Sequence, residues 1–370
     1  MSGVDFLDKL LIGANVDWMP LGDVVTFQRG KRLVKSQLEE VGSYAVFQNS
    51  MTPLGYYHES NVQGDTAFVI AAGAAGEIGF SEYEFWAADD VYFCLPSNKV
   101  RQKYLYHFLL MKKTEISSQV RRASIPRLSK AVIEKLEIPI PCLNNPKKSL
   151  EIQAEIVRIL DAFTELTTEL TTELTTRKKQ YEHYRDQLLS FEDGIPFKRL
   201  GDVVRIKNGK DHKSLGDGEF PVYGSGGVMR YADAFAYNKP SVLIPRKGSL
   251  GNLFFVDVPF WNVDTIFYTE IDEAQIIPKF LYYFLTTVGL GEMNQAGGVP
   301  SQTQAVLNEL KIPLPTLKVQ REIAAILDKF DALTNSLTEG LPREIELRQK
   351  QYAHYRDLLL SFSKLAAEEA

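Results

Sequence analysis

The chain carries two long runs in which apolar residues recur at steps of four and three. The first extends from Ser149 to Phe191 and the second from Thr316 to Phe362. This spacing places the apolar side chains on one seam of an α-helix that faces a partner helix. The 43 residues of the first run would span roughly 65 Å. The pattern therefore predicts two struts, capped by Ser149 and Thr316, that pack on each other as an antiparallel pair.

The two runs match at their ends and differ in the middle. EIVRILDAF corresponds to EIAAILDKF and QYEHYRDQLLSF to QYAHYRDLLLSF, while the first run also contains LTTELTTEL. The second run holds one more four-residue unit, since 23 rather than 19 residues separate the shared Asp and Gln. Each such unit would move a helix end by ~6 Å. A spacer of set length and a low-complexity run that drifted by duplication both fit this pattern.

A break in the helix is expected in the second run. Gly340, Leu341 and Pro342 follow one another there, and a proline in a helix interior costs ~3 kcal/mol. We expect a break or kink at this point, so that the two struts are not strictly equivalent.

The runs belong to a repeat of the whole chain. WMPLGDVV returns as FKRLGDVV, KYLYHFLL as KFLYYFLT, and SIPRLSKAVIEKLEIPIP as GVPSQTQAVLNELKIPLP. AAGAAGEIG likewise corresponds to IPRKGSLG. The predicted domains are therefore residues 1–148 (first globular head), 149–192 (central spacer helix), 193–315 (second head) and 316–370 (C-terminal spacer helix).

Within each head the pattern is mixed. Short apolar runs such as TAFVI and SVLIP are broken by glycine turns, and one amphipathic helix is expected over 103–111 and over 279–286. The predicted fold class is two α/β (α+β) heads joined by two long antiparallel coiled-coil helices, related by a pseudo-twofold internal repeat.

Composition places the chain among globular proteins, with 45% hydrophobic and 24% charged residues. We expect no membrane span, because no stretch approaches 18 consecutive apolar residues, and no signal peptide, because the N-terminus lacks a basic region. A cytoplasmic location is the default expectation. Cys94 and Cys142 form neither a zinc pattern nor a disulfide framework, and the five scattered histidines predict no metal site.

Motifs for catalysis are missing from the sequence. It has no GxxxxGK[ST] phosphate loop, no HExxH and no Asn/Asp-Pro-Pro-aromatic tetrapeptide. The glycines of 73–79 have the wrong spacing for a dinucleotide-binding turn, and a tight turn between strands is the favoured interpretation. We therefore expect a non-catalytic chain.

Basic residues give the functional signal. Residues 99–135 contain ten Lys or Arg and two acids, in a chain whose net charge is -5. Such a run is either a solvated surface or a phosphate-binding face; arginines beside polar loop residues suit phosphate and base contacts. The DNA-binding candidates in the first half are Arg29, Lys31, Arg32, Gln48, Asn49, Ser50, Arg121, Arg122 and Arg127. Those in the second half are Lys207, Asn208, Lys210, His212, Ser225, Arg230, Arg246, Lys247, Ser249 and Gln302.

The halves share their framework and differ in their loops: FQNSM stands against YGSGG, and RRASIPR against AGGVPSQ. If the loops recognise something, the two halves recognise different things. A rigid spacer with two different heads implies a target with two unequal half-sites at fixed spacing.

Taken together, these features resemble the specificity subunit of a type I restriction-modification system. The motifs are YGSGG, RKGSLG, PFWNVDT, FLYYFL, IPxPxxxxQxEI, ILDxF and QYxxYRDxLLxF, in this order over residues 15–364. The resemblance implies two target recognition domains that each bind half of a bipartite double-stranded DNA sequence. It also implies that the spacer helices dock two methyltransferase subunits, with restriction/translocase subunits added for cleavage. S-adenosylmethionine, ATP and Mg would then lie on those partners. The candidate partner-binding residues are Tyr181, Tyr184, Arg185, Tyr352, Tyr355 and Arg356.

Two other readings stay open. A coiled-coil scaffold with two protein-binding heads would show no sequence-dependent binding of DNA. A self-sufficient methyltransferase or nuclease would bind S-adenosylmethionine by itself, although the sequence offers no place for that cofactor.

Overall fold

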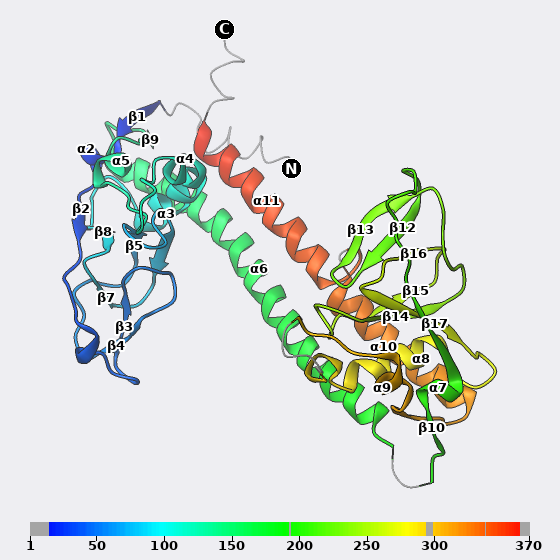
Figure 1. Ribbon diagram of the computed structural model, residues 1–370. Helices are drawn as coiled ribbons and strands as arrows, with labels where there is room; N and C mark the ends of the chain where they lie inside the picture. Colours follow the sequence, from blue (N-terminus) through cyan, green and yellow to red (C-terminus); the bar gives the residue numbers. More distant parts are fainter. Residues whose placement is uncertain (1–14, 192–193, 294–298, 337, 363–370) are drawn as a thin grey trace. The chain divides into compact units, whose positions relative to one another are not determined.

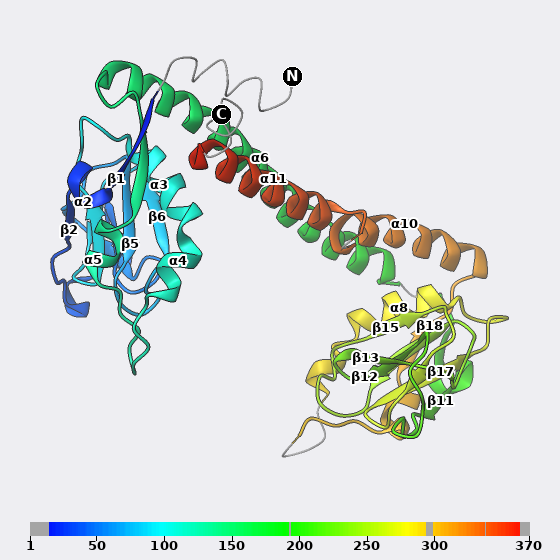
Figure 2. The same ribbon diagram turned by 90° about the horizontal axis from the view of Figure 1, so that it is seen from above.

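The computed structural model describes residues 15–191, 194–293, 299–336 and 338–362. It divides into two compact units: unit 1 comprises Met1–Leu170 and Glu344–Ala370, and unit 2 comprises Thr171–Arg343. Each unit holds one globular head and stretches of the two helical runs (Figures 1 and 2). The boundaries between the units therefore fall inside the helical runs rather than at the ends of the heads.

Head 1 is built from nine strands, four α-helices and one 3-10 helix in the described residues. In chain order its elements are β1 (Val16–Pro20), α2 (Leu21–Val24), β2 (Phe27–Arg29), η1 (Lys35–Gln37), β3 (Tyr44–Phe47), β4 (Gly55–Tyr57), β5 (Thr66–Ile70), β6 (Ile78–Ser81), β7 (Phe85–Ala87), β8 (Val91–Cys94), α3 (Gln102–Met111), α4 (Lys113–Ser118), α5 (Lys130–Glu134) and β9 (Glu137–Pro141). The strands form an antiparallel sheet β2-β8-β5-β6, a sheet β4-β3-β7 and the pair β1-β9.

The central strand β5 is buried along its whole length, because both faces of its sheet are covered. Ala67 and Val69 lie in the core that includes α3, whereas Phe68 and Ile70 lie in a second core with Phe85 of β7. This alternation is the period of two that a strand imposes on its side chains. Figure 2 shows α3 beside β5 and β6.

Head 2 repeats this plan. In chain order its elements are β10 (Phe197–Arg199), α7 (Leu200–Val203), β11 (Val204–Asn208), β12 (Phe220–Gly224), β13 (Gly227–Ala232), β14 (Ser241–Pro245), β15 (Phe254–Val256), β16 (Trp261–Asn262), β17 (Ile266–Ile271), α8 (Pro278–Thr287), η2 (Leu290–Glu292), α9 (Gln304–Asn308) and β18 (Lys311–Pro313). The sheets β11-β17-β14-β15 and β13-β12-β16 and the pair β10-β18 match those of head 1 strand for strand. The internal repeat and the two amphipathic helices, now α3 and α8, are confirmed.

The first helical run is one unbroken helix, α6 (Pro146–Leu189), of 44 residues (Figure 1). It begins three residues earlier than predicted, so Ser149 is buried inside the helix and does not cap it. The backbone N–H of Lys148 instead donates to Oδ1 of Asn145 at 3.2 Å, which makes Asn145 the cap and puts Pro146 at the first helical position. The predicted end at residue 192 lies outside the described residues.

The second run is two helices, α10 (Leu317–Asn335) and α11 (Leu341–Ser361). Thr316 caps α10 as predicted, since its side chain accepts from the N–H of Val319. The expected break at Gly340 and Pro342 is confirmed. A Cβ on Gly340 would lie 2.4 Å from the carbonyl oxygen of Ala332, so only glycine allows the chain to fold back on the end of α10.

The helical runs pack against each other within each unit. In unit 1 the ring of Phe163 in α6 stacks on Tyr355 in α11 with centroids 5.1 Å apart, and Ile156 shares a core with Leu360. In unit 2 Phe330 of α10 stacks on Tyr184 of α6 at 5.6 Å. Along the two runs, Ile156 and Phe163 of the first meet late residues of the second, whereas Tyr184 meets the earlier Phe330, so the pairing of the runs is antiparallel as predicted.

Candidate nucleic-acid interface

Two loops of head 1 leave the four-stranded sheet at the same end. Arg29 at the end of β2 pairs with Tyr92, and Ile70 at the end of β5 pairs with Val91 at the start of β8. Neighbouring antiparallel strands bring the end of one beside the start of the next. The turn after β2 and the glycine turn after β5 therefore lie together.

The glycine turn joins two further loops to this end of the sheet. The N–H of Gly73 donates to the carbonyl of Pro126 at 3.1 Å, and the N–H of Ala74 donates to that of Asn49 at 2.9 Å. Gly73 has a φ of +80°, and a Cβ there would lie 2.7 Å from the oxygen of Asn49. Glycine at this position therefore permits the close approach of the loop that carries Gln48, Asn49 and Ser50.

The loop 121–127 brings arginines to the same place. Arg121 and Arg127 pair with each other through both backbone hydrogen bonds, at 2.9 and 3.1 Å. Their side chains and that of Arg122 are exposed, and they form no ion pair with any described residue. Three exposed cations without an acidic partner among the described residues form a surface suited to an anionic ligand.

The basic turn after β2 is held by tryptophan. The indole Nε1 of Trp86 donates to the carbonyl of Lys31 at 3.0 Å, and a Cβ on Gly30 would lie 2.2 Å from the oxygen of Ala88. Lys31 and Arg32 are exposed, whereas Arg29 lies 3.9 Å from Asp90 and donates to the carbonyl of Asp89. The turn thus adds two cations without a described acidic partner.

Five of the other seven cations in the basic run 99–135 have a partner within the chain. Lys103, Lys112, Lys113 and Lys130 form ion pairs, and Arg101 donates to a carbonyl at the start of α6. For these residues the solvated or structural interpretation fits the contacts. Lys99 and Lys135 are exposed without an ion pair among the described residues, but they lie outside the loop 121–127. The phosphate-binding interpretation therefore fits best for the arginines of that loop.

Head 2 assembles its loops in the same way. The N–H of Gly248 donates to the carbonyl of Pro300 at 2.9 Å, as Gly73 does to Pro126. Ser225 lies beside this turn, since a Cβ on Gly248 would be 3.2 Å from its Oγ. Arg246, Lys247 and Ser249 follow β14 at the end of the sheet where Asn208 of β11 lies, and Trp261 donates to the carbonyl of Lys210 as Trp86 does to Lys31.

Four of the DNA-binding candidates of head 2 have side chains engaged within the head. Arg230 donates to the carbonyls of Leu215 and Gly216, Lys207 lies 3.8 Å from Glu270, and Asn208 accepts from Gln304. Gln302 is a correction: its side chain is 1% exposed and donates to the carbonyl of Pro245 at 2.6 Å, so it faces the core rather than a duplex. His212 is half-buried, with Nδ1 unpartnered among described residues.

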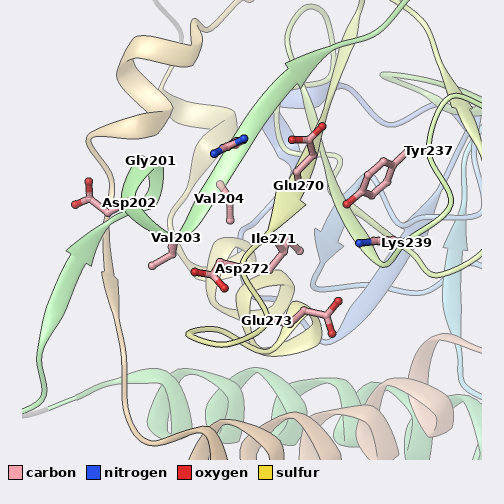
Figure 3. Close-up of a pocket in the computed structure, with 11 residues that line it drawn as sticks. Gly201, Asp202, Val203, Val204, Tyr237, Lys239, Glu270, Ile271, Asp272 and Glu273 are labelled. Carbon is pink, nitrogen blue, oxygen red and sulfur yellow. The ribbon is translucent and has the colours of Figure 1, made fainter.

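The opposite end of the head 2 sheet carries the opposite charge. A groove of about 870 Å³ at the start of β11 is lined by Asp202, Glu270, Asp272 and Glu273, against Arg205 and Lys239 (Figure 3). Burial and then the carboxylate of Glu270 raise the pKa of Tyr237 there. An acidic groove repels phosphate, so only the loop end of this sheet suits DNA. Among the described residues, no group of three or more His, Cys, Asp or Glu side chains is placed to hold a metal ion.

Comparison with known proteins agrees with this geometry. The family model "Type I restriction modification DNA specificity domain" matches residues 15–177 and 192–347. The chain belongs to the type I restriction-modification DNA specificity family. It is 35% identical to the Type I restriction enzyme EcoR124I/EcoR124II specificity subunit of Escherichia coli, with 98% of each chain covered. It is 31% identical to the EcoprrI specificity subunit of Escherichia coli, covering 92% of this chain and 93% of that one.

A solved structure shares the fold of this specificity chain. The Type-I restriction-modification S subunit from M. genitalium matches with a TM-score of 0.66 at 20% identity, covering 93% of this chain and 95% of that one. In the described residues no helix is both long enough and apolar enough to span a membrane.

The partner-binding candidates of the specificity chain lie on α6 and α11. The guanidinium groups of Arg185 and Arg356 lie over the rings of Tyr181 and Tyr352, at 5.9 and 5.6 Å. Tyr181 and Tyr352 pack on the cores of their units, whereas Tyr184 is 45% exposed. These contacts give most of the set a role within the chain, and their binding to a partner stays a prediction.

A polar joint that sequence reasoning missed connects head 1 to both helical runs. His107 of α3 lies 3.0 Å from Asp161 of α6 and 2.8 Å from the hydroxyl of Tyr352 of α11, and Lys103 donates to Asp161 at 3.0 Å. Burial acts to raise the pKa of Asp161, but the hydrogen bonds from His107 and Lys103 outweigh it and hold that pKa below its ordinary value.

Unit 2 has the corresponding joint. Lys279 and Tyr283 both donate to Asp328 at 2.7 Å, so Tyr283 stands where head 1 has His107. The repeated ILDxF motif, which holds Asp161 and Asp328, and the repeated lysines were visible in the sequence. The sequence showed that these residues recur but not which residues they contact, because the contacts join residues far apart in the chain.

Buried glutamines at the start of each helical run complete the attachment. Gln153 accepts from the N–H of Arg101 at 2.9 Å, and Gln320 accepts from the N–H of Ile277 at 2.8 Å. Each glutamine thereby satisfies a backbone donor just before the first turn of α3 or α8. The Gln of the QxEI sequence that both halves share is thus a structural residue that fixes each head to its helix.

Proposed function

We propose that this chain is the non-catalytic DNA-recognition subunit of a type I restriction-modification complex. Each head binds one half of a two-part DNA target, and the helical runs hold the heads and dock the partner subunits. The observation that carries this proposal is the convergence, in each head, of loops from separate parts of the chain at one end of the four-stranded sheet, where cations without described acidic partners gather.

The partners follow from the same proposal. Two methyltransferase subunits bind the helical runs, and restriction/translocase subunits join for cleavage. S-adenosylmethionine, ATP and Mg belong to those partners, in keeping with a sequence that carries no phosphate loop or amino-methylating motif. The names of the E. coli relatives, which are specificity subunits of type I restriction enzymes, support this assignment.

The test is methylation mapping with the full chain and its methyltransferase partner in cells. We expect methylated sites that share two short specified sequences separated by an unspecified gap of constant length. Exchange of residues 43–135 for those of a related chain should alter one half-site only. A change in both half-sites would mean that the heads do not act independently.

Binding measurements distinguish DNA recognition from the alternative of a protein scaffold. A DNA-recognition subunit should discriminate target from non-target duplex within the complex, with an affinity that falls steeply with salt. A protein scaffold with two protein-binding heads would show no sequence-dependent shift of DNA mobility. Binding of S-adenosylmethionine by the isolated chain would favour the self-sufficient enzyme instead.

A further inference from the structure

The two heads carry a cation at the same place, supplied from opposite sides of one backbone pair. Ala72 pairs with Arg127 in head 1, and Lys247 pairs with Ser301 in head 2. The flanking hydrogen bonds show that these pairs are equivalent. Leu128 donates to Ala71 and Gly73 to Pro126, as Gln302 donates to Arg246 and Gly248 to Pro300.

The positive charge lies on one member of the pair in head 1 and on the other member in head 2. Ala72 corresponds to Lys247 and Arg127 to Ser301, so each head has one cationic and one small side chain. Side chains directly opposite each other in an antiparallel pair lie on the same face, about 5 Å apart at Cβ. Both arrangements therefore project one positive charge from nearly the same point of the head.

The environment of these cations indicates an anionic ligand. Arg127 and Lys247 are exposed, and neither forms an ion pair with a described residue. Arg127 also lies directly opposite Arg121 through a second backbone pair. Like charges opposite each other destabilise the free protein, and an anion bound between them would relieve that cost.

We propose that Arg127 and Lys247 are equivalent anchors for a DNA backbone phosphate, one for each head. The inference rests on the proposed function and adds which residue of each interface binds the DNA backbone rather than the bases. An arginine and a lysine from opposite strands differ in length and in donor geometry, and what they share is charge. Charge suffices for a phosphate, whereas a base edge requires donors at fixed positions. Two heads that recognise different sequences can thus share one backbone contact.

The experiment uses the full chain in its complex with the methyltransferase partner and measures DNA affinity across a salt series. Arg127→Ser and Lys247→Ser should each make the slope of log K against log salt shallower by about 0.9. Between about 50 and 200 mM salt, each variant should then lose about 3.5-fold less affinity than the wild type loses. Base preference at both half-sites should stay unchanged, since a phosphate contact carries no sequence information. Lys135→Ser and Lys239→Ser, which remove exposed lysines away from the loops, are the matched controls.

A more specific experiment moves the positive charge to the opposite member of each backbone pair. Ala72→Lys with Arg127→Ser gives head 1 the arrangement of head 2, and Lys247→Ser with Ser301→Arg does the reverse. Each double variant should recover the slope that its single variant lost. Because Ala72 is 3% exposed, thermal unfolding should establish that its variant folds, and the head 2 pair decides the outcome where it does not.

The possible failures are distinguishable. Relaxed base preference at one half-site with an unchanged salt slope would make the residue a base contact and overturn the inference. Single variants that match their controls would also overturn it while leaving the proposed function intact. A wild-type complex that fails to discriminate target DNA would instead contradict the proposed function.

Discussion

Nδ1 of His107 lies 2.8 Å from the hydroxyl of Tyr352, although 245 residues separate them in the sequence. The opposite ring nitrogen of His107 lies 3.0 Å from Asp161. Since a carboxylate accepts, Nε2 donates to it, and in the neutral ring Nδ1 accepts from the tyrosine. One side chain of head 1 therefore bonds to both helical runs at once.

Removing that hydroxyl should weaken unit 1. Tyr352→Phe leaves Nδ1 of His107, a residue 1% exposed, without its partner, at a cost of about 1–3 kcal/mol in the free energy of unfolding. Denaturant unfolding of the full chain measures this change. Tyr355→Phe is the control on the same helix, because its hydroxyl has no hydrogen bond among the described residues. Equal losses in the two variants would contradict the assignment.

The joint should also respond to acid. The pKa of Asp161 is lower than its ordinary value, because hydrogen bonds from His107 and Lys103 outweigh burial. A carboxyl group with a depressed folded pKa contributes stability above its unfolded pKa, and that contribution is lost as pH falls through the folded pKa. Asp161→Asn should therefore be less stable than the wild type near neutral pH, with the gap closing below about pH 4. A gap that stayed constant from about pH 7 to about pH 3 would argue against this role.

The buried glutamines should contribute alike in both units. Gln153→Leu and Gln320→Leu each remove a side chain that is 0% exposed and leave a backbone N–H without its acceptor. We expect each substitution to cost about 1–3 kcal/mol in the free energy of unfolding, and the two costs to add, because the sites share no partner. Gln187→Leu, on an exposed position of α6, should change stability by less than about 0.5 kcal/mol. A Gln153 variant as stable as this control would refute the structural role.

The junction between α10 and α11 should tolerate glycine alone at residue 340. Alanine there would place Cβ 2.4 Å from the carbonyl oxygen of Ala332, and overpacking of this kind costs about 1–3 kcal/mol. Gly226→Ala is the matched control, since nothing lies within 4 Å of its Cβ position. Thermal unfolding should show a lower midpoint for Gly340→Ala alone.

The length of α6 should set the gap in the DNA target. One additional TTEL unit after Leu170 extends this unbroken helix by ~6 Å. We expect the unspecified gap in the methylated sequence to lengthen while both half-sites keep their bases. Methylation mapping decides the point, and altered half-sites with an unchanged gap would contradict the spacer role.

Features that depend on local pattern and on recurrence could be predicted from the sequence. The heptad-like seam predicts the long helices, Gly340 and Pro342 predict the break, and the repeat predicts two heads of one plan. These conclusions hold because helix formation and chain reversal depend on neighbouring residues.

Which residues act together became clear from the folded chain and could not be predicted from its sequence. The aligned blocks of the repeat already place Arg127 opposite Ser301, but AAGAAGEIG and IPRKGSLG differ in length, so the blocks did not set the register in which Ala72 matches Lys247. Nor did they show that Gln302, polar and placed in a loop, has a buried side chain, or that His107 and Tyr352 meet. Each of these facts depends on hydrogen bonds and packing between segments distant in the chain, and such contacts leave no periodic trace in a single sequence.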